Sequence, residues 1–509
     1  MELPRSFEGA RALPVDAIPA TVRAAAVAPR STGRPAGDPV ARPAGDPVAR
    51  LAGPTVEPAG DDPAAPPASY SAAPPASHSA ARPASHSAAP PDDRSLGDPV
   101  GGYLYDLSAA RRRAAGLVAA LPPWAKVCYA VKANAFPPLL SALAEVVHGF
   151  EVASVAEARL ALAAATGVGV PPRLVVSGPA KNPTMLAGLV GQEVPDGSLT
   201  VNVESVLELH RLSRAAVAAG RSAPGREVPV ALRVNPATSP VEVSRAEGLT
   251  MGGVPSPFGI PEAEIPVALR TLGALPGVRF VGFHLHAVSG NMDADLHAQY
   301  VAGAVDWAVR TADAHGLPLR TIDVGGGLGI PFEPGPEFDV EAFGAALPEL
   351  PDGVELILEP GRWMAGPIGW YVTEVVDVKH SYGEVFVVVR GGINHFQLPT
   401  SWEIRHNFAV VPVDDWPSGV PRPSAEQAAV TVSGELCTPE DVLARDVTVD
   451  AVRAGDLLVF PNAGAYGFEF AMPAFLGQPP ARRVALARPD GRPPHPRAAS
   501  RVDDLSNFR

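Results

Sequence analysis

Cysteine is scarce in this 509-residue chain, which has only Cys128 and Cys437. Two cysteines cannot form the disulfide framework that stabilises small secreted domains, so we expect a reducing, cytoplasmic location. Long apolar runs are also missing, and a membrane-spanning helix needs about 18 such residues or more, so no membrane partner is expected. The start, MELPRSFEGARALP, lacks the basic residues and apolar core of a secretory signal.

Basic residues are in the minority. The chain has 41 lysine and arginine residues against 54 aspartate and glutamate residues, which gives a formal net charge of −13. A nucleic-acid-binding protein usually carries a basic surface, so we expect no nucleic acid partner. Hydrophobic residues make up 46% of the chain, which is enough for a large core. The length allows one to three domains.

Proline, alanine and serine dominate the first part of the chain. RPAGDPVA occurs twice in residues 34–49, and residues 64–87 hold three similar copies of AAPPASYS. Such segments have little apolar surface to offset the entropy cost of ordering the chain. We therefore expect residues 1–98 to form a disordered tail with eight-residue repeats, and residues 491–509 to form a flexible tail. A passive tail is the favoured interpretation, and docking to a partner is the alternative.

Strand and helix patterns alternate after residue 98. We expect a lead-in strand and helix in 99–125 and a β/α barrel in 126–366, because strand–helix units repeat along this region. The predicted strands include 126–131, 174–178, 199–203, 230–236, 281–288, 321–327 and 355–361. From 367 to 490 strands follow one another without helices, which predicts a mainly antiparallel β-barrel or sandwich. The predicted fold class is α/β, a (β/α)8 barrel followed by a β domain.

Lys132 stands in YAVKAN (129–134), at the end of a predicted strand and just before a predicted helix. Taken alone, it is most simply a solvated loop lysine, because lysine is mostly exposed. The ends of three other predicted strands, however, also carry polar residues or glycines: His286 with Ser289, Gly325–Gly327, and Glu359 to Arg362. In a β/α barrel such strand ends face one mouth, where active sites form.

Each of these features also has a simpler interpretation. Gly325–Gly327 suit a plain turn as well as a phosphate loop built from backbone N–H groups, and their spacing does not fit a dinucleotide motif. We expect His284 and His286 to face opposite sides of their strand, so no metal site is predicted. Glu359 ends an apolar run and needs a partner, for which Arg362 is a candidate.

Together, the lysine, the glycine turn, the histidine and the carboxylate suit pyridoxal phosphate. This cofactor needs a lysine for a Schiff base, a phosphate cradle, a group against its ring and a partner for its pyridine nitrogen. The same residues resemble a known family, the alanine-racemase-fold decarboxylases that act on ornithine, arginine and diaminopimelate. The resemblance rests on YAVKAN, HAVS (286–289), DVGGG (323–327), EPGR (359–362), SGELCTPEDVLARD (433–446) and NAGAYGF (462–468).

The resemblance implies a role for each motif. Lys132 forms the Schiff base, His286 stacks on the cofactor ring, and Glu359 pairs with the pyridine nitrogen. The phosphate is held by Ser289, Gly325, Gly326, Gly327, Gly361, Arg362 and Tyr466. Cys437 reaches the active site from the neighbouring subunit of a homodimer, where it can return a proton to the α-carbon. Lys132, His286 and Cys437 are thus the implied catalytic residues.

Three departures from the family pattern are visible. Diaminopimelate decarboxylases carry an arginine-proline-x-leucine-tyrosine run after GG(M/I)N, where this chain has GGINHFQLPTSW (391–402). Ornithine and diaminopimelate enzymes carry an acidic residue after the cysteine, where this chain has Thr438. Val288 stands where the family more often has glycine. GGINH, LCTPEDVLARD and NAGAYGF look closer to a specialised branch that includes decarboxylases of carrier-protein-bound glutamate in antibiotic biosynthesis.

The sequence therefore predicts a pyridoxal-phosphate-dependent decarboxylase of specialised metabolism. Its substrate is an amino acid or an amino-acid derivative, either free or bound to an acyl-carrier protein. One alternative is a racemase of the same fold, but those enzymes usually place arginine against the pyridine nitrogen, where this chain has Glu359. The second alternative is a cofactor-binding homologue without catalysis, and the presence of Lys132, Glu359 and Cys437 speaks against it.

Overall fold

The computed structural model describes residues 10–27 and 101–486, apart from 167, 169–171, 193, 196, 238–248, 251–254 and 403. Most of the predicted N-terminal tail and the whole predicted C-terminal tail lie outside these ranges. None of the helices within them is long and apolar enough to cross a membrane.

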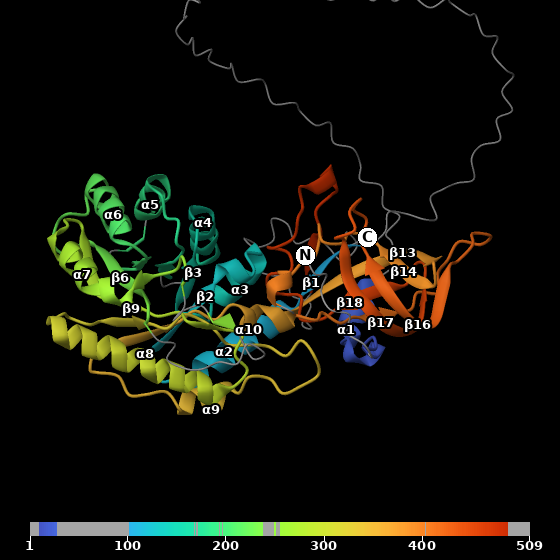
Figure 1. The fold of residues 1–509 in the computed structure, drawn as a ribbon, viewed down its shortest axis with the longest axis horizontal. Coiled ribbons are helices and arrows are strands. Elements are labelled where there is room, and N and C mark those ends of the chain that lie inside the picture. The colour runs from blue at the N-terminus through green and yellow to red at the C-terminus, as the bar shows by residue number, and fades with distance from the viewer. Residues whose placement is uncertain are drawn as a thin grey trace, which may run out of the picture. The chain divides into compact units, whose positions relative to one another are not determined.

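Parallel strands form a closed barrel (Figure 1). They are β2 (Ala125–Ala130), β3 (Gly149–Val152), β4 (Arg173–Val176), β5 (Leu199–Val203), β6 (Val228–Asn235), β9 (Val278–His284), β11 (Thr321–Asp323) and β12 (Glu355–Leu358). The ring runs β2-β3-β4-β5-β6-β9-β11-β12 and closes where β12 pairs with β2. Their side chains are almost all buried, as expected for strands of a parallel sheet covered by helices. Of these strands, β3 was not among those predicted.

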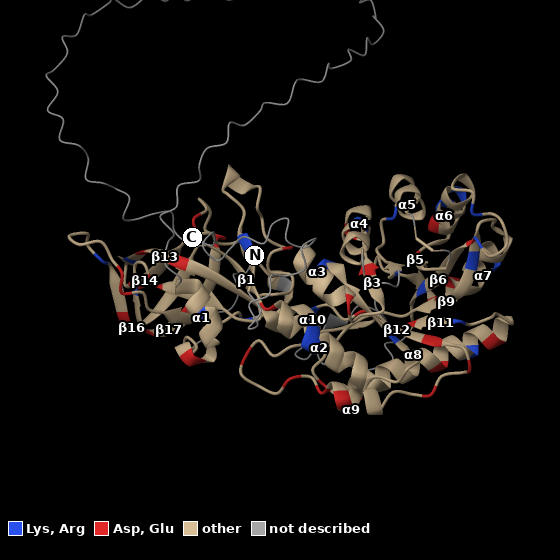
Figure 2. Cartoon of the chain, turned by 180° about the vertical axis from the view of Figure 1, so that it is seen from behind, with Lys and Arg blue, Asp and Glu red and all other residues tan. Residues whose placement is uncertain are grey.

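Helices follow the strands and cover the outside of the barrel (Figure 1). They are α2 (Leu107–Ala120), α3 (Pro137–Ala144), α4 (Val155–Ala164), α5 (Pro183–Val190), α6 (Val206–Ala218), α7 (Ile265–Ala274), α8 (Ala294–His315) and α9 (Val340–Ala345). α8 is amphipathic: Tyr300 and Val301 are buried, whereas Asp306 is exposed. Acidic residues recur along this helix (Figure 2). This pattern packs one stripe of the helix on the barrel.

Polar caps fix the points at which helices begin. The side chain of Ser154 accepts the Glu157 N–H at 3.1 Å, and Asn182 accepts the Met185 N–H at 2.9 Å. Such caps stabilise a helix by about 1 kcal/mol each. Because each cap lies just beyond a strand end, it also fixes the loops that form the mouth of the barrel.

The second domain is an eight-stranded, mostly antiparallel sheet. It contains β1 (Gly101–Tyr105), β13 (Gly369–Ser381), β14 (Glu384–Val389), β15 (Ala409–Val411), β16 (Ser424–Ser433), β17 (Val442–Arg453), β18 (Leu457–Phe460) and β19 (Arg482–Ala485). β1 pairs with β13 and β19, so the predicted lead-in strand belongs to this sheet, while α2 packs on the barrel helices. The barrel and the β domain together confirm the predicted fold class.

Residues 10–27 are ordered, and the prediction of a disordered segment over 1–98 is wrong for them. Arg11 and Leu13 bridge to Thr448 and Ala409 of the second domain. α1 (Ala20–Val27) then buries Val22 against the sheet. A proline- and alanine-rich composition, averaged over the tail, conceals this short apolar segment. Residues 28–98 lie outside the described part of the chain.

Candidate active site

Lys132 lies in a short turn that follows β2. Its Nζ atom is 2.8 Å from the carboxylate of Glu151, a buried residue on the neighbouring strand β3. The Lys132 side chain is 41% exposed, toward the mouth of the barrel. Burial of the amine lowers the pKa of Lys132, but attraction to Glu151 and Glu359 outweighs it, so the pKa lies above its usual value. Sequence reasoning missed Glu151 because it missed β3.

One pocket gathers nearly all the predicted cofactor residues. Its lining includes Lys132, His286, Ser289, Gly326, Gly327, Glu359, Gly361, Arg362 and Tyr466. Of the predicted set, Gly325 adjoins the pocket without lining it, and Cys437 is not part of the lining. These residues are far apart in sequence. They follow the strands β2, β9, β11 and β12, and Tyr466 comes from the segment between β18 and β19.

Gly325, Gly326 and Gly327 follow β11 and form a closely packed turn. Gly325 and Gly327 have φ values of 69° and 104°, a backbone conformation that favours glycine. A side-chain carbon at Gly326 would overlap the Glu359 carbonyl, and one at Gly325 would overlap the His286 ring. Only glycine therefore allows the loop to pass this close to β12.

Tyr466 comes from the second domain, and two hydrogen bonds to backbone carbonyl groups hold its segment at the mouth of the barrel. The Tyr466 N–H donates to the Ala133 carbonyl at 2.7 Å, and the Asn134 side chain donates to the Gly464 carbonyl at 2.7 Å. Tyr466 has a φ of 67°, which is unfavourable for a residue with a side chain. Backbone strain of this kind clusters at ligand sites, where surrounding contacts enforce it.

His284 and His286 lie on the same side of β9, and the expectation that they face opposite sides is wrong. Their ring centroids are 6.3 Å apart and the rings are nearly parallel. Residues two apart in an extended segment share a face, which explains the arrangement. Burial and the nearby charge of Arg233 hold the pKa values of both rings well below their ordinary value, so both are neutral.

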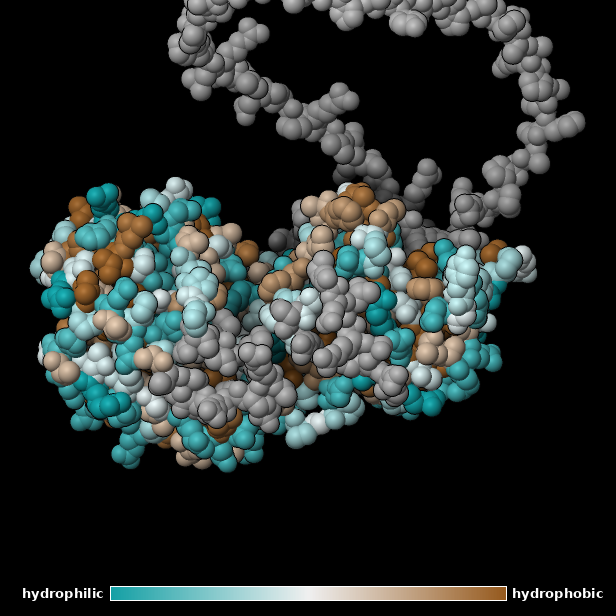
Figure 3. Space-filling model, viewed as in Figure 1, coloured by the Kyte–Doolittle hydropathy of each residue, from teal (hydrophilic) through white to brown (hydrophobic). Residues whose placement is uncertain are grey.

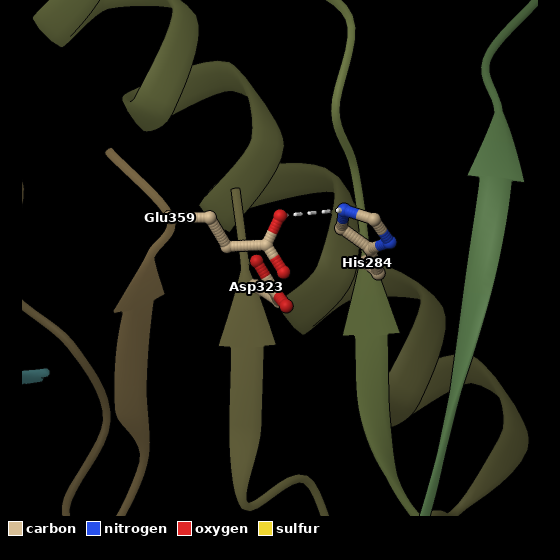
Figure 4. A group of neighbouring side chains, drawn as sticks. All are labelled: His284, Asp323 and Glu359. Atoms are coloured by element: carbon tan, nitrogen blue, oxygen red, sulfur yellow. Dashed lines mark ion pairs between the residues drawn. The ribbon is translucent and has the colours of Figure 1, made fainter. Parts of the chain in front are cut away.

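His284, Asp323 and Glu359 form a buried group that we call the acid cluster (Figure 4). Glu359 Oε2 is 3.9 Å from His284 Nε2, and the Asp323 and Glu359 carboxyl groups lie against each other. Burial raises the pKa values of both acids, and the neighbouring Asp323 raises that of Glu359 further. Among the described residues, this is the one group whose atoms are close enough to hold a metal ion.

Arg362 is not the partner of Glu359 that the sequence allowed. Its guanidinium lies 4.5 Å from the ring centre of Trp402 and 5.1 Å from that of Tyr466. Glu359 Oε1 and His286 Nδ1 are buried and have no hydrogen-bond partner in the described part of the protein. Buried polar atoms without partners are costly, so these two atoms indicate a missing ligand. A glycine cradle, a neutral ring, a lysine and an unmatched carboxylate fit pyridoxal phosphate.

Cys437 is exposed, on the loop between β16 and β17 of the second domain. Asp441 fixes this loop: its carboxylate accepts the N–H groups of Ile393 and Leu436, both at 2.7 Å. Glu435 adds an ion pair with Arg390 and accepts a hydrogen bond from Asn394. The loop is therefore rigid within its own domain and presents its cysteine outward.

A second, larger cavity of about 710 Å³ opens beside the first and shares Lys132 and Tyr466 with it. Its walls are mostly apolar and include Leu160, Phe468 and Phe470. Arg483 lies at its edge, with its guanidinium 4.1 Å from the ring centre of Phe468. This cavity leaves room for a large group next to the lysine.

Comparisons with known proteins agree with this geometry. Residues 107–366 match the family model described as pyridoxal-dependent decarboxylase, pyridoxal binding domain. The 2-[(L-alanin-3-ylcarbamoyl)methyl]-2-hydroxybutanedioate decarboxylase of Staphylococcus aureus is 34% identical over 389 residues, which cover 75% of this chain and 92% of the relative. The L-glutamyl-[BtrI acyl-carrier protein] decarboxylase of Niallia circulans is 32% identical over 346 residues, which cover 65% and 76% of the two chains.

Solved structures agree on the fold. The crystal structure of AQ1208 from Aquifex aeolicus has a TM-score of 0.61 and 28% identity, and the match covers 75% of this chain and 85% of that one. Diaminopimelate decarboxylase from Helicobacter pylori has a TM-score of 0.64 at 24% identity, covering 77% and 92%, and supports the fold alone. The fold and the pocket define a pyridoxal-phosphate enzyme built on a β/α barrel. The chain belongs to the pyridoxal-dependent decarboxylases, which confirms the predicted family, cofactor and enzyme class over the racemase alternative.

Proposed function

We propose that the chain decarboxylates an α-amino acid whose distal end is joined to a larger polar group. The observation that carries the proposal is that one pocket, lined by residues of five separate motifs, adjoins a cavity of about 710 Å³ that shares Lys132 with it. When bound, pyridoxal phosphate supplies a sink for the electron pair left on the α-carbon by loss of carbon dioxide.

The chain's own residues hold the cofactor in place in this proposal. Lys132 is the attachment point, and Glu151 at 2.8 Å keeps its amine charged until the cofactor arrives. Neutral His286 would stack on the cofactor ring. Glu359 would keep the pyridine nitrogen protonated, because a carboxylate favours the charged form of a neighbouring base.

Other residues of the same lining would hold the phosphate. Ser289, Gly326 and Gly327 line the pocket, and the backbone N–H groups of such a turn suit an anion. Gly361 and Tyr466 complete the cradle. Arg362 supplies the positive charge, since its buried guanidinium is fixed over Trp402 and Tyr466.

The size and polarity of the substrate are inferred from three observations. The two relatives described above act, by their names, on an amino-acid unit joined to a citrate-like acid and on a glutamyl group carried by a protein. Thr438 replaces the acidic residue that would hold a distal ammonium group, and the arginine that would hold a second carboxylate is missing. The large cavity beside Lys132 accommodates a bulky group instead. A carrier-bound substrate and a small conjugated acid both satisfy these observations.

We also propose that the enzyme works as a homodimer with shared sites. Cys437 is exposed and held rigidly by Asp441, as suits a residue that acts in a neighbouring subunit. Phe470, Met472, Phe475 and Leu476 are between 40% and 52% exposed on the segment that borders the larger cavity, and apolar side chains gather on this projection (Figure 3). An exposed apolar patch next to a site is typical of an interface. Both cysteines are free, which agrees with a cytoplasmic location.

A substrate panel tests the proposed activity. Cofactor-loaded protein is incubated with free glutamate, ornithine and diaminopimelate, with an amide of 2,3-diaminopropionate and a tricarboxylic acid, and with a glutamyl carrier-protein thioester. We expect loss of one carbon dioxide from a conjugated substrate, measured by mass spectrometry, and none with Lys132→Ala. Turnover of free ornithine or diaminopimelate at a higher kcat/KM would contradict the proposed substrate class.

Mixed dimers test the shared site. Lys132→Ala and Cys437→Ala proteins are each weakly active or inactive, and their mixture is assayed after subunit exchange has been verified by native mass spectrometry. Cys128→Ala, at a buried barrel position, replaces Cys437→Ala in the control mixture. Recovery of activity in the first mixture supports sites built from two subunits. Absence of recovery after verified exchange means that each chain builds its own site.

A further inference from the structure

The acid cluster lies directly below the pocket on three adjacent strands. His284 ends β9, Asp323 ends β11, and Glu359 follows β12; His284 and Asp323 are partners in the register of β9 and β11. All three are almost completely buried, with exposures of 1%, 1% and 4%. Of these residues only Glu359 lines the pocket, and His284 and Asp323 flank its carboxylate from behind the pocket wall.

Two N–H donors fix the position of the Asp323 carboxylate. It accepts the N–H of Gly325 at 2.9 Å and the side-chain N–H of Asn202 at 3.0 Å. These donors hold the Asp323 carboxyl group still, and its remaining contact is with the Glu359 carboxyl group. Two buried acids side by side must share a proton, because like charges this close cannot both be ionised.

His284 is fixed by its burial but lacks partners. Neither ring nitrogen has a hydrogen-bond partner within the described ranges, and Nε2 faces Glu359 Oε2 (Figure 4). The ring is neutral, so it carries one N–H donor. At 3.9 Å the pair is longer than a hydrogen bond, and such contacts often tighten when a ligand binds. A donor at this place favours the ionised form of Glu359.

We propose that His284 and Asp323 are positioning residues: both hold the orientation of the Glu359 carboxylate against the pyridine nitrogen of the cofactor, and His284 alone favours its charged form. His284 supports the charged carboxylate with an N–H donor, and Asp323 fixes the group from the other side. The same three side chains do not form a separate metal site, because Glu359 is the wall of the cofactor pocket and the oxygens of Asp323 are already occupied by N–H donors. The inference rests on the proposed role of Glu359.

Binding of two cofactor forms tests the proposal without relying on turnover. The probes are pyridoxal 5′-phosphate and its 1-deaza analogue, in which a C–H group replaces the ring nitrogen. Affinities are measured by absorbance titration of cofactor-free protein. His284→Leu should weaken binding of the natural cofactor by roughly tenfold, the effect of losing one hydrogen bond to a charged group, and leave the analogue unchanged. His284→Gln, which keeps an N–H donor, should recover most of the loss.

A double variant separates this proposal from the one on which it rests. Glu359→Gln should show the same selective loss, and His284→Leu added to it should cause no further loss, because residues that act through one group are not additive. Equal weakening of both probes by His284→Leu, or a further independent loss in the double variant, would overturn the role of His284. Failure of Glu359→Gln to distinguish the probes would instead overturn the proposed role of Glu359.

Asp323→Asn completes the series. The amide still contacts Glu359 but cannot share a proton in the same way, so we expect a selective loss for the natural cofactor here too. Melting temperatures of the cofactor-free variants report on folding separately, and His284→Phe, which also lacks an N–H donor but keeps a ring, replaces His284→Leu if that variant does not fold. If Asp323→Asn binds both probes with the affinity of the parent, the proposed positioning role of Asp323 is wrong.

Discussion

Two groups of buried charged side chains lie at the mouth of the barrel, and they differ in whether their charges are matched. On the β4–β6 side, Lys181 lies 2.9 Å from Glu208, and Arg233 lies 2.9 Å from Glu204. We call these four residues the paired cluster. On the β9–β12 side, the acid cluster has two acids and a neutral histidine without a cation within the group.

This difference distinguishes buried charged residues that stabilise the fold from buried charged residues that bind a ligand. Buried ion pairs that are fully matched hold loops in place, and the cost of desolvation is offset within the protein. A buried carboxylate without a cation is destabilising on its own, and perturbed acids of this kind cluster at functional sites. The paired cluster therefore stabilises the loops at the barrel mouth. The charge of the acid cluster is matched only when a ligand binds.

Replacement of Glu359 should give the largest effect. Glu359→Gln removes the charge that holds the pyridine nitrogen protonated, so kcat should fall by about 10³-fold, roughly 4 kcal/mol in the barrier. The cofactor-free variant should be at least as stable as the parent, because an unmatched buried acid is gone. Steady-state kinetics and thermal melts measure the two effects. Near-normal kcat, or a marked loss of stability, would place Glu359 among structural residues.

Replacement of Lys181 should give the opposite pattern. Lys181→Met leaves Glu208 without its cation, and breaking a buried pair costs about 3–5 kcal/mol of folding free energy. Urea unfolding measures this loss, and the fraction that folds should still bind the cofactor at Lys132. The control is Lys379→Met, whose pair with Asp377 is exposed and contributes less than about 1 kcal/mol. If both variants lose the same stability, the paired cluster does not support the fold.

The pH dependence of stability sharpens the comparison further. The pKa values of Glu359 and Asp323 are raised from ordinary values of 4.5 and 3.8, so the folded protein keeps protons that the unfolded chain has released. This contribution to stability is fully present below about pH 4 and is lost as the pH rises through the folded pKa values.

Melting temperatures of cofactor-free protein between pH 4 and pH 7 measure this effect. We expect Glu359→Gln to gain stability relative to the parent as the pH rises, by a few degrees at most. Ionisable groups outside the acid cluster are the same in both proteins and cancel in the difference. A difference that stays constant across the range would show that Glu359 has an ordinary pKa in the folded protein.

Local sequence patterns predicted much of the active site because its motifs are short and continuous. Lys132, the glycine turn and Glu359 each follow a strand, and a barrel brings strand ends together whatever the rest of the sequence is. Glu151 was not predicted because β3 is only four residues long and buried throughout, so its sequence shows no alternation of apolar and polar residues. The paired cluster was not predicted because its members come from three separate segments, the loop before α5, the start of α6 and the strand β6, each of which looks ordinary on its own.

Long-range pairing explains the other differences. β1 precedes the barrel in sequence yet pairs with β13 and β19, which no local pattern indicates. Residues 10–27 are ordered only because Val22 and Ile18 find an apolar surface on the second domain. The position of Cys437 relative to the active site depends on a second subunit and stays a prediction.

The most direct test of the account is to locate the cofactor on the chain. Purified holoprotein is reduced with borohydride, digested and mapped by mass spectrometry. The account predicts a single pyridoxyl-modified residue, Lys132, and loss of the label in Lys132→Ala but not in Lys181→Met. A label on Lys181 or Lys126, or a label that persists in Lys132→Ala, would contradict the assignment of the pocket.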